Sequence, residues 1–400
     1  MKRKISIGAS IALMLIGAAI TFQLTYVYVG RSYDDKITEI NNARSDFQKL
    51  ANVDEIVREL YVKDIDETKL SDMIIKGYIA GLNDKYSSYL TKEEYAEYTA
   101  SFNGEVCGIG INVSYNKITG EIYVYDVVKD SPADKAGIKI GDMLYKVGDE
   151  YVSDIGLYSA ANKIKGNAGT AVTISVMRDE KEYAFTVERA SVHRDSVSYK
   201  MISDSIGYIA ITQFDLNAAE LFKTAVDSLI SSGAKALLFD VRNNPGGDYN
   251  AVCDILDYLL PEGPIVRTYK KDGTEDGRDS DANEIKLPMA VITNSSSASA
   301  SELFTAALKD YKKARSFGTT TYGKGTVQSV YKLPDLSALI ISSQLYCPPF
   351  SENFEGKGVT PDETVELSDE KLSRFYFLNE DEDDQLVAAR NYLETAIAKK

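Results

Sequence analysis

Three apolar segments in the second half of the chain, each with a helical pattern after it, limit the fold most. They are GYIAITQF (207–214), AKALLFDVR (234–242) and MAVITN (289–294), and helical patterns such as AAELFKTAVDSLI and SELFTAALKDY follow. This alternation predicts an α/β core around a largely parallel sheet. Ligand sites in such sheets lie beyond the carboxyl ends of the strands, so we expect a site in the turns that follow them.

The rest of the chain differs from this core, and the predicted class is an α/β (α+β) multidomain protein. A helical N-terminal region is expected over 31–102, with helical patterns at 33–60 and 71–98. A small β-rich domain is expected over 103–190, where short runs such as EIYVYDVV and AVTISVMRD lie between glycine and aspartate turns. The α/β core then covers 191–365. A C-terminal helical segment, which contains the acidic run NEDEDD, covers 366–400.

The N-terminal region, 1–30, reads as a membrane anchor or a signal segment. It begins MKRK and has no charged residue from Ile5 to Val29. At about 1.5 Å per residue, this length crosses a bilayer of roughly 30 Å. The basic head is expected to stay inside and the rest of the chain to face the outside. Gly17 and Ala19 also fit a cleavage site, so a cleaved signal peptide stays open as the alternative.

Composition excludes several classes of function. The net charge is −15 and no Lys/Arg block follows residue 4, so a nucleic-acid partner finds no basic surface. Cys107, Cys253 and Cys347 lie far apart without a C-x-x-C pair, which argues against a zinc or redox site and favours buried free thiols. We expect no metal or organic cofactor. His193 is the single histidine, which restricts the choice of a catalytic base.

The turn after the third apolar segment is NSSSASASELF (294–304), with five serines in eight positions. One interpretation is helix capping, because Ser299 and Glu302 fit the S-x-x-E capping box. The other is a nucleophile, because a serine at a helix N-terminus lies near backbone N–H groups that stabilise an oxyanion. Position alone leaves both interpretations open.

A serine nucleophile needs a base, and two residues are candidates. His193 lies between the β-rich domain and the core, where a surface histidine is the ordinary interpretation. Lys324 lies between two glycines in TTTYGKGTVQSV and precedes a predicted strand. Burial lowers the pKa of a lysine and so makes it a base, whereas a solvated loop lysine stays charged.

SASASE and TTTYGKGTVQ together resemble the C-terminal processing peptidases, also called tail-specific proteases, which are serine hydrolases with a Ser-Lys dyad. The resemblance implies Ser299 as nucleophile, Lys324 as general base and Gln328 as the residue that orients the lysine. On an extended strand Gln328 would lie roughly 13 Å from Lys324, so the segment must bend for the two to touch.

Three further segments extend the resemblance over the chain. GLNDKYSSYLTKEEY (81–95) is similar to the family's N-terminal motif, with Asn-Asp-Lys where L-D-P-Y-S is usual, and GKGVTPDETVEL (356–367) is similar to its G-I-x-P-D segment. KALLFDVRNNPGG (235–247) matches its strand and turn, which implies an oxyanion hole from Gly246 or Gly247 together with Ala300. Leu336 stands where the family commonly has glycine, which puts the local turn in question.

The β-rich domain resembles a PDZ module. In GEVCGIGINV (104–113), the resemblance implies that the backbone of Gly108, Ile109, Gly110 and Ile111 grips a peptide C-terminus. SPADKAGIKIGD further on belongs to the same pattern. Lys165 stands where an arginine is frequent, so a bidentate contact with a carboxylate is less available.

The resemblance implies an extracytoplasmic serine endopeptidase that recognises apolar C-terminal tails and cleaves proteins by acyl transfer. A catalytically silent tail-binding adaptor is the alternative, although this chain keeps the serine, the lysine and the glycines that such an adaptor loses. A hydrolase of small amides or esters leaves the PDZ module without a purpose. The expected partners are protein or peptide substrates, the membrane through the N-terminal segment, and a second copy of the chain in a homodimer.

Overall fold

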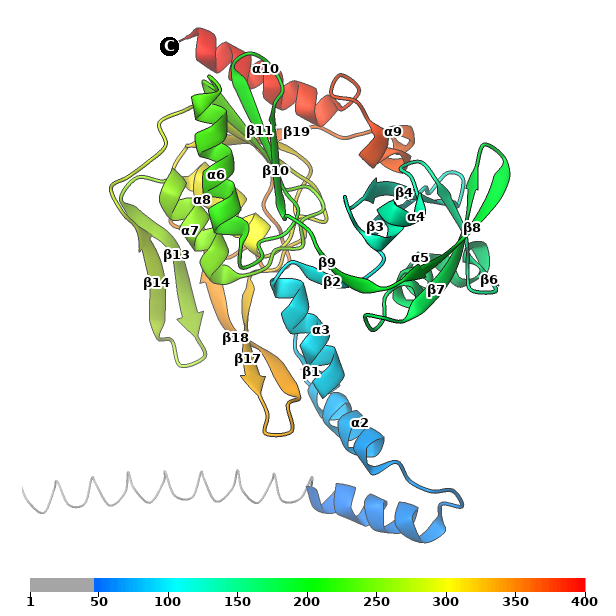
Figure 1. Cartoon of the computed structure of the whole chain (residues 1–400). Helices are drawn as coiled ribbons and strands as arrows, with labels where there is room; N and C mark the ends of the chain where they lie inside the picture. Colours follow the sequence, from blue (N-terminus) through cyan, green and yellow to red (C-terminus); the bar gives the residue numbers. More distant parts are fainter. Residues whose placement is uncertain (1–46, 400) are drawn as a thin grey trace, which may run out of the picture. The chain divides into compact units, whose positions relative to one another are not determined.

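A largely parallel sheet forms the centre of the predicted core in the computed structural model, which describes residues 47–399 (Figure 1). The strand order is β10-β11-β12-β15-β16-β19, with bounds Val197–Met201, Ile206–Ile211, Ala236–Asp240, Met289–Thr293, Ala314–Gly318 and Glu363–Thr364. In this sheet β11, β12, β15, β16 and β19 are parallel to one another, and β10 runs antiparallel to β11. The predicted α/β class is confirmed.

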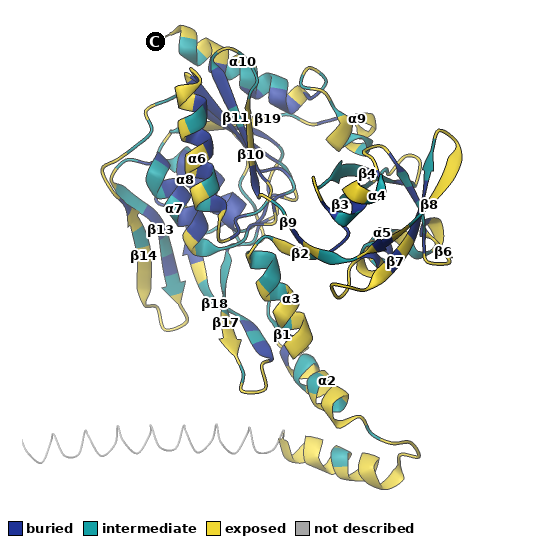
Figure 2. Ribbon diagram, viewed as in Figure 1, coloured by how far each residue is buried: buried dark blue, intermediate teal, exposed yellow. Residues whose placement is uncertain are grey.

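Helices cover both faces of this sheet. Helices α6 (Ala218–Ser231), α7 (Tyr249–Leu259) and α8 (Ala300–Asp310) pack on one face, and α10 (Asp384–Ala398) packs on the other. Alternate residues of β12 point to opposite faces of the sheet. Leu237 and Phe239 belong to the hydrophobic cluster with α6 to α8, and Ala236 and Leu238 belong to the hydrophobic cluster with α10. Every residue of β12 is buried, as expected for a central parallel strand. Figure 2 shows this buried centre.

A second sheet is formed by strands that alternate in sequence with those of the parallel sheet, and it supplies part of the site. Its order is β1-β18-β13-β14, with β17 on the same β18, and its bounds are Ser88–Leu90, Ala338–Cys347, Gly263–Lys270, Glu275–Ser280 and, for β17, Thr326–Lys332. All its pairings are antiparallel. The hairpin β17–β18 follows directly on the loop that holds Lys324.

The β-rich region forms its own sheet in the order β3-β4-β5-β7-β8, with β6 on β5. The strand bounds are Ile111–Tyr115, Ile122–Val127, Met143–Val147, Ala171–Arg178, Lys181–Glu188 and, for β6, Glu150–Tyr151. Helices α4 (Pro132–Ala136) and α5 (Val152–Ile164) complete it. The chain enters and leaves the region through an antiparallel pair, β2 (Glu105–Gly108) with β9 (Ala190–His193).

The N-terminal region is helical, with one correction. A helix covers 47–60, and α2 (Glu67–Ala80) and α3 (Lys92–Phe102) follow. The predicted helical pattern over 71–98 is wrong in its middle, where a turn and the short strand β1 separate α2 from α3. Asn83 takes a positive φ of 54° in this turn, and the Asp84 carboxylate accepts the Tyr86 N–H, so local hydrogen bonds end the helix.

The contacts divide the chain into a unit that ends at Met73 and a unit that begins at Ile74. In the first unit, the helix at 47–60 leaves its apolar residues Phe47, Ile56 and Leu60 exposed. The predicted anchor lies outside the described residues. Within 47–399, no helix has both the length and the apolar character that a membrane crossing needs.

A C-terminal segment returns from the core before α10 begins. It contains α9 (Asp369–Ser373) and the 3₁₀ helix η1 (Phe375–Phe377). The Tyr376 ring stacks on the Tyr125 ring of β4, with centroids 3.7 Å apart and planes 8° apart. This segment therefore contacts the β-rich region as well as the core.

Candidate active site

Ser299 stands at the sharp turn between β15 and α8. Its φ is 55° and its ψ is −113°, a combination that residues with a Cβ rarely adopt. Backbone strain of this kind costs about 1–3 kcal/mol and is concentrated at functional sites. The turn places Ser299 at the N-terminus of α8, where it lines a cavity.

The other serines of the cluster have different environments. Ser297 and Ser301 are fully buried, and their hydroxyls donate to the carbonyl oxygens of Val241 (2.7 Å) and Asn244 (3.0 Å). They join the serine turn to the turn that follows β12. Ser295 and Ser296 are exposed. Ser299 alone among the five lines the cavity.

Asn244 organises the turn that contains Asn-Pro-Gly-Gly. Its side chain is fully buried; Nδ2 donates to the Ile211 carbonyl (2.9 Å) and Oδ1 accepts the Gly246 N–H (2.8 Å). Its carbonyl oxygen also accepts the Ala298 N–H at 3.0 Å. One asparagine thus connects the end of β11, its own turn and the serine turn.

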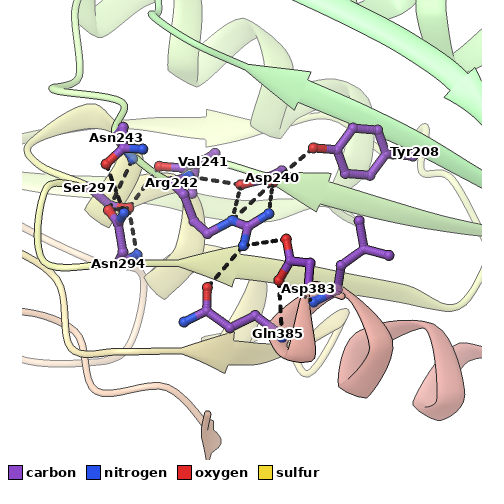
Figure 3. Close-up of polar contacts among 10 residues, drawn as sticks. Tyr208, Asp240, Val241, Arg242, Asn243, Asn294, Ser297, Asp383 and Gln385 are labelled. Carbon is purple, nitrogen blue, oxygen red and sulfur yellow. Dashed lines mark hydrogen bonds and ion pairs between the residues drawn. The ribbon is translucent and has the colours of Figure 1, made fainter. Parts of the chain in front are cut away.

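A buried ion-pair network anchors the start of the same turn (Figure 3). The Arg242 guanidinium contacts the Asp240 carboxylate at 2.6 Å and the Asp383 carboxylate at 2.7 Å, and donates to Gln385 Oε1 at 3.0 Å. The Tyr208 hydroxyl donates to Asp240 at 2.8 Å. The carboxyl end of β12 is therefore joined to the start of α10, and removing one partner would leave a buried charge uncompensated.

The glycines after Pro245 allow the two turns to approach closely. A Cβ on Gly246 would lie 2.8 Å from the Ser299 Cβ, and one on Gly247 would lie 2.1 Å from the Phe214 carbonyl oxygen. Both have positive φ, 104° and 145°. The Gly246 N–H donates to Asn244, so of the backbone N–H groups predicted for an oxyanion hole this one already has a partner.

Lys324 lies in the loop between β16 and β17, close to the serine turn. The Tyr322 N–H of this loop donates to the Ser297 carbonyl at 3.0 Å. The Lys324 ammonium lies 4.9 Å from the centroid of the Tyr86 ring. Burial lowers the pKa of Lys324, against the opposing charges of Glu355, Asp84 and Glu302. A lysine in this environment is closer to acting as a base than one in water.

Glu302 connects the serine turn to the lysine loop. Its side chain is fully buried, and Oε2 accepts the N–H groups of Ser299 (2.8 Å) and Lys324 (2.8 Å). Oε1 accepts from the Thr321 hydroxyl (2.5 Å) and the Gly323 N–H (2.7 Å). The contact with Ser299 is the capping interaction predicted for this pair. The contacts with the lysine loop had no signal in the sequence.

One cavity of about 350 Å³ brings the predicted site residues together. Its lining includes Ser299, Ala300, Lys324, Gln328, Gly246 and Gly247. Apolar side chains form much of the remaining wall: Phe102, Val252, Leu303, Val327 and Val330. A concave lining that is largely apolar with a few polar groups is typical of a ligand site.

Gln328 lines the cavity but makes no hydrogen bond to Lys324 within the described residues. Its amide nitrogen donates to the Thr326 hydroxyl (3.0 Å) and the Ser342 hydroxyl (3.3 Å). The register of β17 against β18 shifts between Val327 and Gln328, so the strand is irregular at this residue. Among the described residues, no hydrogen bond joins Gln328 to Lys324 or the Ser299 hydroxyl to the Lys324 amine. Catalytic hydrogen bonds often form only when substrate is bound.

His193 lies away from this cavity. It ends β9, pairs with Glu105, and its ring is 3.6 Å from the Asp195 carboxylate with more than half of its side chain exposed. The ordinary interpretation of this histidine is confirmed. Cys107, Cys253 and Cys347 are free thiols; Cys253 and Cys347 are buried as predicted, whereas Cys107 is only partly buried. Burial raises the pKa of Cys253 to about 12.

A second cavity, of about 230 Å³, lies at the groove of the β-rich domain. It is lined by the predicted Gly108, Ile109, Gly110, Ile111 and Lys165. The edge of β3 that faces it pairs with no strand of the described sheet, since β3 is the terminal strand. An open strand edge with an apolar groove beside it suits an added peptide strand. Gln213 lines both cavities.

Sequence profiles of three known families match the chain. Peptidase family S41 matches residues 205–365, the PDZ domain matches 107–188, and the N-terminal domain of the activating protease CtpB matches 14–94. A CtpA-like serine protease of Staphylococcus aureus (strain COL) is 34% identical over 378 residues, which cover 92% of this chain and 73% of that protein. Its counterpart in Staphylococcus haemolyticus (strain JCSC1435) is 33% identical over 362 residues, 89% of this chain and 71% of that protein.

Solved structures agree with these matches. The photosystem II D1 C-terminal processing protease is similar with a TM-score of 0.51 and 26% identity, over 76% of this chain and 84% of that one. An S41 protease of Bacteroides fragilis NCTC 9343 has a TM-score of 0.60 at 16% identity, over 85% and 93%, a likeness of fold alone.

Fold and relatives together define a serine-type peptidase that carries a PDZ domain. The chain belongs to peptidase family S41, in the group of the C-terminal processing peptidases.

Proposed function

We propose that this protein is an extracytoplasmic endopeptidase that holds the C-terminal tails of protein substrates in its PDZ groove and cleaves them with a Ser299–Lys324 dyad. The proposal rests on one observation above all. A serine with a strained backbone, a lysine with a lowered pKa, and the residues Gly247 and Ala300 all line a single cavity.

The chemistry follows from these positions. Neutral Lys324 accepts the Ser299 hydroxyl proton while the serine oxygen attacks the scissile carbonyl carbon, and the N–H groups of Gly247 and Ala300 hold the resulting oxyanion. The carbon–nitrogen bond then breaks, and the Lys324 ammonium gives its proton to the leaving amine. Water, deprotonated by the same lysine, hydrolyses the acyl-enzyme and frees the serine. Gln328 supports the lysine in this proposal.

The open edge of β3 and the N–H groups from Gly108 to Ile111 support the tail-binding part. An extended tail would pair with β3, its terminal carboxylate would lie at this loop, and apolar residues would enter the groove. Lys165 is exposed at the end of α5 and lines the groove, so it supplies a positive charge near the carboxylate. A lysine makes this contact as a point charge, without the planar fork of an arginine.

The location and assembly are proposed from the N-terminal residues. The uncharged segment from Ile5 to Val29 supports export, with an anchor that stays or a signal peptide that is removed. The exposed apolar side chains of the helix at 47–60 support association with a second copy, since an exposed apolar stripe favours a partner.

The test of the dyad is cleavage of an unfolded model protein with an apolar C-terminus. We expect wild type to cut it, while Ser299→Ala and Lys324→Ala lose activity by at least about 10³-fold and keep their fold by circular dichroism. Ser296→Ala, at an exposed serine of the same cluster, is the matched control and should cut as wild type does. Tail binding without cleavage in wild type would instead identify an adaptor.

A further inference from the structure

Tyr86 belongs to the turn between α2 and β1, and that turn is fixed onto the second sheet. The Asp84 carboxylate accepts the Tyr86 N–H (3.0 Å) and the Ser87 hydroxyl (2.5 Å). The Ser87 oxygen in turn accepts the Ser342 N–H of β18 at 3.0 Å. The next residue, Ser88, pairs with Ile340 of the same strand. The turn is thus held to the strand that carries Tyr346, which also lines the catalytic cavity.

The Tyr86 ring covers the amine of Lys324. The ammonium lies 4.9 Å from the ring centroid, while the Lys85 ammonium lies 4.8 Å from it. Tyr86 is absent from the described lining of the catalytic cavity, so it contacts the lysine from outside the space that a substrate would fill. Its hydroxyl is buried and has no hydrogen-bond partner among the described residues. The ring, rather than the hydroxyl, is therefore the group that Tyr86 brings to the site.

The charges around Lys324 explain why shielding its amine from water with the Tyr86 ring would affect its pKa. Glu302 of α8, Asp84 of the same turn and Glu355 of the loop after β18 all raise the pKa of Lys324. Burial lowers it and is the largest influence. Tyr346 of β18 lies against the loop as well, and its hydroxyl donates to the Lys324 carbonyl at 2.8 Å. If water reached the amine, the three carboxylates would favour the ammonium form, which accepts no proton.

We propose that Tyr86 is a positioning residue whose ring excludes water from Lys324 and holds the amine toward Ser299. This inference rests on the proposed function, because it assumes that Lys324 is the base. It gives the N-terminal region a part in catalysis, since the turn before β1 supplies the ring.

The experiment compares Tyr86→Leu and Tyr86→Phe in the full chain, with kcat/KM measured against pH. Without the ring, water weakens the effect of burial, the pKa of Lys324 rises, and the acid limb of the profile moves to higher pH. The attraction of the ring for a cation acts in the opposite direction. We take the loss of burial to be the larger effect, because burial is the largest influence on the pKa of Lys324. We expect Tyr86→Leu to be about 10-fold less active at pH 7 and to recover toward wild type as the pH rises.

Tyr86→Phe keeps the ring and loses a hydroxyl that has no hydrogen-bond partner in the described part of the chain, so it should stay within about 2-fold of wild type and keep its acid limb. Tyr331→Leu, at an exposed tyrosine of β17, is the matched control and should leave the profile unchanged. Tyr86→Met fills more of the ring's volume and takes the place of the leucine variant if that variant does not fold.

Two outcomes overturn the inference. One is an acid limb of Tyr86→Leu or Tyr86→Met at the wild-type pH, and the other is a loss of the same size at every pH, which would indicate a structural role. Lys324→Ala is measured beside them. If Lys324→Ala retains activity, the dyad itself is wrong; if it is inactive while the profile of Tyr86→Leu is unchanged, only the role of Tyr86 fails.

Discussion

At the scale of single residues, Glu302 makes more hydrogen bonds within the site than the one capping contact that the sequence predicted for it. Its two oxygens accept from the backbone of Ser299, Gly323 and Lys324 and from the Thr321 hydroxyl. All four partners are donors, so the site needs an acceptor at both oxygens. An ionised carboxylate meets that need, and an amide does not.

We therefore expect Glu302→Gln to be both less stable and less active. The new NH₂ group would face donors in a fully buried place, which costs about 1–3 kcal/mol. The displaced lysine loop would lower kcat by about 10²-fold. Urea unfolding and kcat measure the two effects. Glu220→Gln, on the exposed start of α6, is the control, and a Glu302→Gln variant that matches it would show that the carboxylate is dispensable.

The sequence predicted the chemistry of single residues only in part. From the residues alone, capping and nucleophilic roles for the serines stayed open, and the family resemblance selected Ser299. The structure shows why local patterns could not separate the serines. Ser297 and Ser301 bond to Val241 and Asn244, which lie more than fifty positions earlier in the chain. Contacts between such distant segments leave no periodicity in a sequence.

At the scale of elements, the strongly patterned segments were predictable. The strands β11, β12 and β15, the helices after them and the turns at their carboxyl ends follow from apolar runs and helical spacing. The error over 71–98 arose because the turn at Asn83 and Asp84 is made by side-chain hydrogen bonds inside a sequence with helical spacing. The position of β1 beside β18 depends on a pairing over some 250 residues, which no local signal contains.

The turn between β17 and β18 contains backbone strain at Leu336 that a substitution can test. Leu336 takes a φ of 73°, where the family commonly has glycine, and its side chain is largely exposed. A left-handed conformation costs a residue with a Cβ about 1–2 kcal/mol, and the freedom that glycine adds to the unfolded chain returns about 0.5–1 kcal/mol of that.

Leu336→Gly should therefore raise the free energy of unfolding by up to about 1 kcal/mol. Leu336→Ala is the control: it removes most of the side chain and keeps the Cβ, so it should show no gain. Equilibrium unfolding in urea decides between them. Equal stabilities for the two variants would mean that the turn relaxes without strain.

At the scale of the whole molecule, the PDZ domain and the core share more than a linker. Gln213 lines both cavities, and Arg194 donates to the Asn112 side chain of β3 at 3.0 Å. The stacked pair Tyr125 and Tyr376 joins the PDZ sheet to the C-terminal segment. Composition changes along the chain predicted where these regions lie. The composition changes do not predict the contacts between the regions, because those contacts depend on single aromatic and polar pairs.

This arrangement predicts that the state of the substrate tail affects cleavage. We expect wild type to cut a substrate with a free terminal carboxylate faster than one with an amidated terminus. Lys165→Ala should reduce that preference about 2- to 5-fold, as for one exposed charge. Lys163→Ala removes a neighbouring lysine that pairs with Glu150 and should keep the preference. Equal cleavage of the two substrates by wild type would contradict recognition of the carboxylate.

The position of Glu302 also links the two sheets at the site. Ser299 follows a strand of the parallel sheet, whereas the Lys324 loop leads into the second sheet, and one carboxylate holds both backbones. A small slide of one sheet past the other would break those hydrogen bonds before either sheet lost a strand. Nucleophile and base would then separate in a single event. Glu302 therefore makes the position of the nucleophile depend on the position of the base through one side chain.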